Sequence, residues 1–237
     1  MTESLGRAPM FRFESEMAPT VSQWLRAAGL RVKQEFMTPW GVCDFVALRF
    51  NSDRVDHRLN LRQTRSVGSL TQAILLLQVP DIDTRKATTV DKLVKRCVPV
   101  LAAKEVEREV SRLVAHRFLV QSRNGRLQKV NGWMPIQERL VTVELKLARV
   151  QEAMQQAKKN LDLGAESYVA FPSDVANRIA AKPQRWQRYF DVGIGLLAVS
   201  PSNCTQLIGA RVTGATYDQA VQLHAVEKFW RTRLRDI

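Results

Sequence analysis

The segment Val141-Thr142-Val143-Glu144-Leu145-Lys146-Leu147 is the part of the chain around which the rest can be interpreted. It alternates apolar and polar residues with a period of two, which predicts a β-strand carrying Thr142, Glu144 and Lys146 on one face. It is also the only place where Asp or Glu is followed two residues later by Lys. On a strand that faces a cleft, this pair would place a metal-binding carboxylate next to a cation.

Net charge favours a polyanionic partner. The chain of 237 residues has a formal net charge of +13 and a sequence pI near 10.2. Such a basic surface attracts nucleic acid or an anionic membrane, and nucleic acid is the better prediction because no apolar run approaches the length of a membrane span. The first residues lack the apolar core of a signal peptide, so we expect a cytoplasmic protein.

Cysteine and histidine contents argue against two other kinds of site. Cys43, Cys97 and Cys204 are widely spaced and include no CxxC pair, so neither a disulfide framework nor a zinc site is expected. The three histidines show no ligand spacing either.

Patterns on both sides of the central segment predict an α/β fold with a mixed, largely buried sheet flanked by helices. Residues 14–28 form an amphipathic helix pattern, and two strand-like segments follow on either side of Pro39-Trp40-Gly41. Asp44 lies in the second of these, within the apolar run VCDFVALRF, where an ionisable group needs a partner or a metal. After the central strand the expected order is helix 148–164, strand 167–171, helix 173–182, strands 192–200 and 205–212, and a terminal helix.

A glycine pattern near the end of the chain is treated as a coincidence. Gly193-Ile194-Gly195-Leu196-Leu197-Ala198 fits the dinucleotide fingerprint GxGxxA, but the glycines lie in a strand-like run instead of a turn that opens a helix.

Residues 51–137 differ from their surroundings in charge and in pattern. Residues 51–139 hold 17 Lys and Arg against 9 Asp and Glu, a net of +8. A polar segment that reads as a linker comes first, followed by helix patterns at 67–79, 88–97 and 101–118 and a predicted hairpin around Asn124-Gly125.

Three helices followed by a basic hairpin resemble a winged helix-turn-helix domain. The resemblance implies that the third helix enters the DNA major groove while the hairpin reaches phosphate. The residues that would do so are Lys104, Arg108 and Arg112 on the helix, and Arg123, Arg126 and Lys129 on the hairpin. The alternative is that the helix cations form an ordinary solvated face paired with nearby glutamates.

The arrangement outside this insert, 1–50 and 138–237, resembles the PD-(D/E)xK nuclease superfamily, with its restriction-endonuclease-like fold. Asp44 matches the lone Asp of the motif, and Glu144 with Lys146 matches the (D/E)xK pair. Glu16 matches the acid on the first helix, and Gln156 matches a Gln often found on the helix after the motif. The chain departs from the pattern at Cys43, which stands where the motif has Pro, and in the inserted segment that separates Asp44 from Glu144.

The resemblance implies a metal-dependent endonuclease that hydrolyses phosphodiester bonds in DNA, with RNA as a further substrate to test. Asp44, Glu144 and Glu16 would bind Mg²⁺ or Mn²⁺, and Lys146 would orient the attacking water or neutralise charge on the phosphate. The main alternative is a DNA-binding regulator that keeps the nuclease fold without cutting, and a scaffold protein with incidental charge is a third interpretation. A homodimer is compatible with the sequence.

Overall fold

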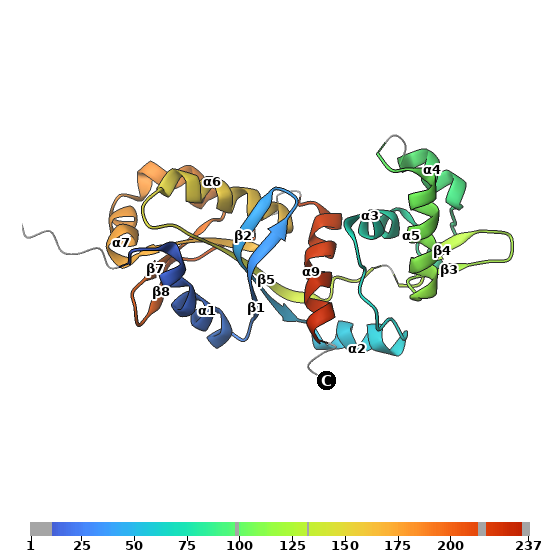
Figure 1. Cartoon of the computed structure of the whole chain (residues 1–237), viewed down its shortest axis with the longest axis horizontal. Helices are drawn as coiled ribbons and strands as arrows, with labels where there is room; N and C mark the ends of the chain where they lie inside the picture. Colours follow the sequence, from blue (N-terminus) through green and yellow to red (C-terminus); the bar gives the residue numbers. More distant parts are fainter. Residues whose placement is uncertain (1–10, 98–99, 132, 213–216, 234–237) are drawn as a thin grey trace, which may run out of the picture. The chain divides into compact units, whose positions relative to one another are not determined.

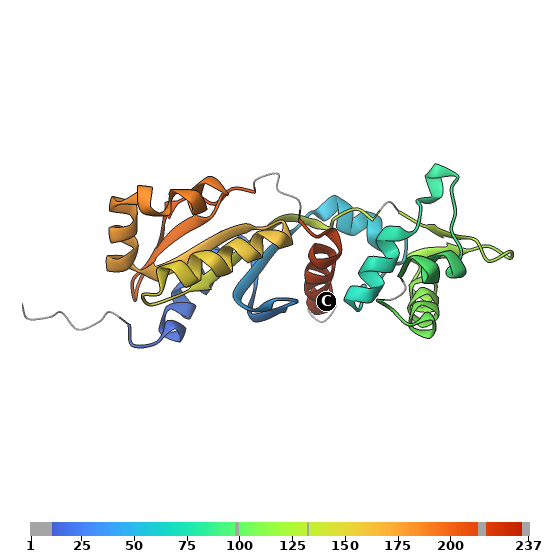
Figure 2. The same ribbon diagram turned by 90° about the horizontal axis from the view of Figure 1, so that it is seen from above.

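The computed structural model describes residues 11–97, 100–131, 133–212 and 217–233. The chain divides into two compact units, unit 1 (Met1–Arg49 and Arg139–Tyr217) and unit 2 (Phe50–Glu138 and Asp218–Ile237). Each unit is therefore built from two separate pieces of the chain, and each is considered by itself below (Figures 1 and 2). No helix of the described residues is long and apolar enough to cross a membrane.

Unit 1 contains a six-stranded mixed sheet in the order β1-β2-β5-β6-β7-β8. Its strands are β1 (Arg31–Thr38), β2 (Gly41–Phe50), β5 (Gln137–Leu145), β6 (Glu166–Pro172), β7 (Gly195–Val199) and β8 (Cys204–Ile208). The pairs β1–β2 and β7–β8 are antiparallel, whereas β5–β6 and β6–β7 are parallel. The expected α/β class with a mixed sheet is thus confirmed.

Helices cover both faces of this sheet. The helical segments of unit 1 are η1 (Glu14–Met17), α1 (Ala18–Ala27), α6 (Val150–Asn160), η3 (Leu161–Leu163), α7 (Ser173–Ala181), η4 (Pro183–Trp186) and α8 (Gln187–Asp191). One core cluster joins α1 to strand residues such as Val143 and Leu145, and another joins α6, α7 and α8 to residues such as Val169 and Phe171 (Figure 1). Because Val143 and Leu145 point toward α1, Glu144 between them points to the α6 side of the sheet.

Unit 2 is mainly helical. Its elements are α2 (Ser52–Asn60), α3 (Leu70–Gln78), η2 (Ile82–Thr84), α4 (Val90–Cys97), α5 (Ala103–Ala115), β3 (Leu119–Gln121), β4 (Leu127–Lys129) and α9 (Gln219–Arg233). The strands β3 and β4 form an antiparallel hairpin whose turn includes Gly125 at φ +76°, a conformation that glycine adopts without strain. A further antiparallel bridge joins Thr88 to Leu127 on the other side of β4. The predicted succession of three helices and a hairpin is therefore present at 70–129.

The segment expected to be a linker is instead part of the core of unit 2. Residues 52–60 form α2, capped by the Asn51 side chain, which accepts a hydrogen bond from the Arg54 N–H. Arg58 of this helix is 1% exposed and donates two hydrogen bonds to Glu227 of α9, at 2.6 and 3.0 Å. The guanidinium also lies 4.0 Å from the ring centre of Trp230. The linker interpretation was wrong because the polar composition does not indicate that Arg58 is buried. Its partners Glu227 and Trp230 lie near the other end of the sequence.

The terminal helix also differs from its expected position. The sequence interpretation placed residues 138–237 in one domain, whereas α9 belongs to unit 2 and packs on α3. Its apolar residues, among them Leu223, Val226 and Phe229, complete the buried interior of that unit. A helix pattern reveals that a face must be buried, but it carries no information about which unit buries it.

Candidate functional site

Asp44 and the Glu144–Lys146 segment meet within unit 1, although 101 positions separate Asp44 from Leu145 in the sequence. The contact is direct, because the Leu145 N–H donates a hydrogen bond of 2.7 Å to Oδ2 of Asp44. Neighbouring strands β2 and β5 supply the two sides of this contact. The backbone of the motif strand thus holds the lone aspartate beside the Glu-x-Lys pair.

Glu144 is the deepest of these residues, at 3% exposure. Asn160, the last residue of α6, donates a hydrogen bond of 2.6 Å from Nδ2 to Oε1 of Glu144. Oδ1 of the same Asn160 side chain in turn accepts a hydrogen bond of 3.1 Å from Nε1 of Trp40, in the β1–β2 turn. A chain of hydrogen bonds from the turn through α6 therefore fixes the orientation of the buried carboxylate.

Burial raises the pKa of Glu144 to about 7, and the charge of Asp44 contributes to the increase while the Asn160 hydrogen bond opposes it. Burial also raises the pKa of Asp44, which the Leu145 N–H bond counteracts. Because the negative charge of Asp44 disfavours a second charge beside it, a proton on Glu144 near neutral pH partly relieves the repulsion between the two carboxyl groups.

Lys146 lies just beyond the end of β5, with its side chain 9% exposed. Its ammonium nitrogen is 3.4 Å from Oε2 of Glu14. The charges of Lys146 and of Glu14 both act on Asp44, the one lowering and the other raising its pKa. The cluster therefore contains three acids, Glu14, Asp44 and Glu144, around one lysine.

The expectation for Glu16 needs correction. Its carboxylate is exposed and accepts hydrogen bonds from the backbone N–H groups of Arg12 at 2.6 Å and Phe13 at 3.3 Å. Glu16 thus caps the start of the first helical segment, while Glu14, two residues earlier, reaches Lys146. Residues two apart lie on nearly opposite sides of a helix. The predicted helix therefore contained the acid that contacts Lys146, but the prediction selected Glu16 instead of Glu14.

Gln156 lies one turn before Asn160 on α6, and its side-chain oxygen is buried without a hydrogen-bond partner among the described atoms. Because residues four apart share a helix face, the amide lies on the same side of α6 as the contact with Glu144. Asn160 and Trp40 were not singled out from the sequence. The spacing of Asn160 from Gln156 was the available signal for the first, and no pattern indicated the second.

The donors present suit a hard cation. Among residues 11–97, 100–131, 133–212 and 217–233, no three His, Cys, Asp or Glu side chains are grouped so that they alone could hold a metal ion. Mg²⁺ commonly binds through one or two carboxylates and completes its shell with water and substrate phosphate. Asp44 and Glu144 provide such a pair of carboxylates.

The cations expected to bind DNA in unit 2 occupy different environments. Lys104, Arg108 and Arg112 are exposed on α5, but Arg108 and Arg112 both pair with the buried Glu109, at 2.9 and 2.8 Å. This pairing is what the solvated-face alternative predicts. Each guanidinium keeps further N–H donors, since an arginine has five.

The cations of the hairpin also differ from one another in exposure. Arg123 and Arg126 are exposed beside the turn at Gly125. Lys129 is 6% exposed, and its ammonium nitrogen lies 3.5 Å from Oδ1 of Asp81. The position of Lys129 corrects its expected role, because a buried lysine that neutralises an aspartate is poorly placed to reach phosphate.

Comparison with protein-family models, with curated proteins and with solved structures gives no match for this chain.

Proposed function

We propose that the protein is a Mg²⁺-dependent nuclease whose active site is formed by Asp44, Glu144 and Lys146. The observation that carries the proposal is the meeting of these three residues at neighbouring strands, with Glu144 and Lys146 buried instead of facing bulk solvent. The order of strands and helices in unit 1 supports a restriction-endonuclease-like fold, in which an aspartate strand lies beside the (D/E)xK strand.

The residues of the chain divide the work of phosphodiester hydrolysis. The Leu145 N–H holds Asp44, and Asn160 holds Glu144, so both carboxylates are oriented before substrate arrives. A water oxygen attacks phosphorus and loses a proton to the surrounding water, while the bond to the leaving oxygen breaks and that oxygen takes up a proton. The Lys146 ammonium, with little water around it, orients that water or offsets the negative charge that develops on the phosphate. Bound between Asp44 and Glu144, Mg²⁺ would polarise the phosphate and increase the acidity of the attacking water.

Glu14 has a positioning role in this proposal. Its carboxylate is about one-third exposed and contacts Lys146, so it holds the ammonium group near Asp44 when no substrate is present. An arriving phosphate competes with Glu14 for the same cation. Lys146 can therefore change partners without being left as an unpaired buried charge.

Unit 2 is proposed to bind DNA as a winged helix. The succession α3, α4, α5 and hairpin supports this, as does the antiparallel bridge from Thr88 to Leu127 of β4. The exposed hairpin residues Arg123 and Arg126 are the better-placed phosphate contacts. Because Arg108 and Arg112 are already paired with Glu109, we expect them to contribute less than unpaired arginines would.

Nuclease activity is tested by incubating plasmid, linear duplex, single-stranded DNA and RNA with the protein and Mg²⁺ or Mn²⁺. Glu144→Gln and Lys146→Ala should each lower the cleavage rate by about 100-fold or more, by analogy with the loss of one charge-stabilising group, while leaving nucleic-acid binding largely intact. Glu152→Gln, a change of the same kind at a partly exposed position of α6, is the matched control. Binding without cleavage of any substrate would favour the regulator that keeps the fold without cutting.

The role of unit 2 has its own test. Replacing Arg123 and Arg126 together by Ala should weaken DNA binding and reduce its dependence on salt, because each phosphate contact releases counterions. Cleavage of a short substrate at saturating concentration should change little. If the double variant binds DNA like the parent at every salt concentration, the hairpin is not a DNA contact.

A further inference from the structure

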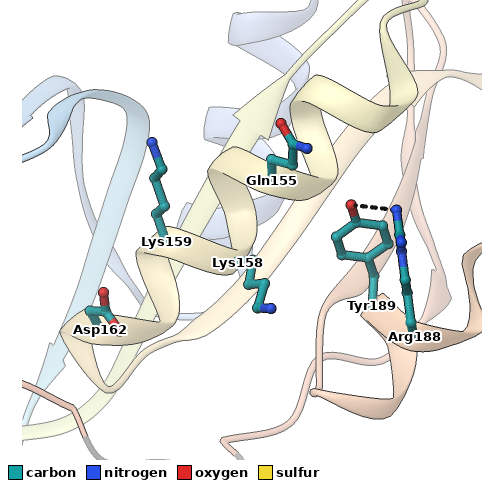
Figure 3. Close-up of a pocket in the computed structure, with 6 residues that line it drawn as sticks. All are labelled: Gln155, Lys158, Lys159, Asp162, Arg188 and Tyr189. Atoms are coloured by element: carbon teal, nitrogen blue, oxygen red, sulfur yellow. Dashed lines mark hydrogen bonds between the residues drawn. The ribbon is translucent and has the colours of Figure 1, made fainter.

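The outer side of α6 carries a basic pocket that does not contain the Asp44–Glu144 cluster. The pocket, called here the α6–α8 pocket, has a volume of about 530 Å³. It is lined by Gln155, Lys158, Lys159 and Asp162 from α6 and η3, and by Arg188 and Tyr189 from α8 (Figure 3). Three cations and a single carboxylate therefore share one hollow within unit 1.

None of these cations is paired with a carboxylate in the part of the chain that the structure describes. Elsewhere in unit 1, Arg139, Arg149 and Arg178 each form an ion pair with a glutamate or an aspartate. Among the described residues, Lys158, Lys159 and Arg188 form no ion pair within 4.0 Å. Three cations against one carboxylate leave the pocket with a net positive charge, so it favours an anion from outside.

Contacts with Tyr189 orient the Arg188 guanidinium so that it can bind such an anion. Its Nη2 donates a hydrogen bond of 3.2 Å to the Tyr189 hydroxyl, and its guanidinium carbon lies 4.8 Å from the centre of the Tyr189 ring (Figure 3). Tyr189 is itself buried, so it provides a fixed support. A guanidinium restricted in this way keeps free N–H donors whose planar geometry matches two oxygens of a phosphate.

A second basic hollow adjoins the same short segment. It has a volume of about 420 Å³ and includes Arg178, Lys182, Arg185 and Trp186 in its lining. Trp186 and Tyr189, one from each hollow, have ring centres 6.4 Å apart. Two neighbouring hollows of the same sign suit an extended polyanion better than a single small anion.

We propose that the α6–α8 pocket binds the phosphodiester backbone of a nucleic-acid strand that continues past Trp186. The proposal rests on the proposed nuclease function for the identity of the polymer, but it concerns a surface of unit 1 that is independent of the winged-helix residues. Lys158, Lys159 and Arg188 contact successive phosphates, and the partly exposed Trp186 ring offers a face on which an unpaired base stacks.

The test measures binding of the full chain to fluorescein-labelled duplex and single-stranded oligonucleotides by anisotropy, in EDTA so that no cleavage occurs. Replacing Lys158, Lys159 and Arg188 together by Ala should weaken binding at least tenfold. The slope of log affinity against log salt should fall by about 2 for single strands or about 3 for duplex DNA, as expected for three lost phosphate contacts. All three side chains are exposed, so the fold should tolerate their truncation.

Two further variants sharpen the result. Asp162→Asn removes the only negative charge of the pocket and should increase affinity severalfold, an effect that damage to the fold would not produce. Arg12, Arg26 and Arg31, all exposed in unit 1, are replaced together by Ala as a control that removes the same net charge elsewhere. Equal losses in the two triple variants would overturn the proposal, because net charge alone would then explain binding.

The remaining outcomes separate this inference from the proposed function. If the parent cleaves DNA while the pocket variant binds and cleaves like the parent, the pocket is not a backbone site and the nuclease proposal stands. If the parent binds through the pocket but cleaves nothing, the pocket is a backbone site and the nuclease proposal fails. If inorganic phosphate displaces DNA from the parent at constant ionic strength, the pocket is a small-anion site and the inference fails.

Discussion

Replacing Glu144 by Gln should stabilise the metal-free protein at alkaline pH, although it changes a residue of the proposed active site. The folded pKa of Glu144 is about 7, against 4.5 for the ordinary group. At about 1.4 kcal/mol for each pKa unit, ionising the buried carboxyl costs unit 1 about 3 kcal/mol. Gln never ionises, and its oxygen can still accept the hydrogen bond from Asn160.

The sign of this effect follows from proton binding. Between pH 4.5 and 7 the folded state holds a proton on Glu144 that the unfolded chain has already released. The stability of the parent therefore falls as pH rises through this window, and the penalty is fully present above pH 7. The variant should match the parent near pH 4.5 and exceed it by up to about 3 kcal/mol at pH 8.

Urea unfolding in EDTA, followed by hydrogen–deuterium exchange of peptides from β5 and β6, measures unit 1 separately from unit 2. Glu152→Gln, at a partly exposed position of α6 paired with Arg149, is the control and should show little pH-dependent difference. Mg²⁺ at 1,000 times its Kd should reverse the order at pH 8, since it adds about 4.1 kcal/mol to the parent alone. A Glu144→Gln stability difference that stays constant between pH 4.5 and 8 would refute the argument.

Two other substitutions test the packing of each unit. Glu227→Ala leaves the buried Arg58 guanidinium unpaired and should destabilise unit 2 by about 3 to 5 kcal/mol in urea unfolding, with partial recovery when Arg58→Met is added; equal stability of the single and double variants would contradict this. Gly195→Ala places a methyl group against the Tyr168 ring and 2.7 Å from the Ala210 nitrogen, so unit 1 should lose about 1 to 3 kcal/mol, seen as a lower Tm; an unchanged Tm would show that the ring moves aside freely.

Local patterns predicted the central features of unit 1 because the relevant information lies within a few residues. Alternation placed Glu144 on the opposite side of β5 from Val143 and Leu145, and an aspartate within an apolar run identified Asp44 as a residue that needs a partner. Strand pairing then brought these residues together without any further signal. The choice of Glu16 over Glu14 failed because the first turn is a 3₁₀ segment, whose rotation a helical period does not specify.

Long-range partners could not be predicted in the same way. Arg58 lies in a segment of high charge, and nothing in its neighbourhood indicates burial, because its carboxylate partner is in α9. Asn160 looks like a solvated helix residue until Glu144 and Trp40 are placed beside it. Buried polar networks depend on pairs that are remote in sequence, which is why composition alone did not identify these residues.

The pairing of Arg58 with Glu227 sets an order of events during synthesis of the chain. The two residues are 169 positions apart, and at about 5 to 20 residues per second the ribosome needs roughly 10 to 30 s to travel from one to the other. Throughout that interval Glu227, the carboxylate that pairs with Arg58 in the buried interior, has not yet been synthesised. We expect α2 to stay hydrated on the nascent chain, and unit 2 to complete its folding only after α9 has been synthesised.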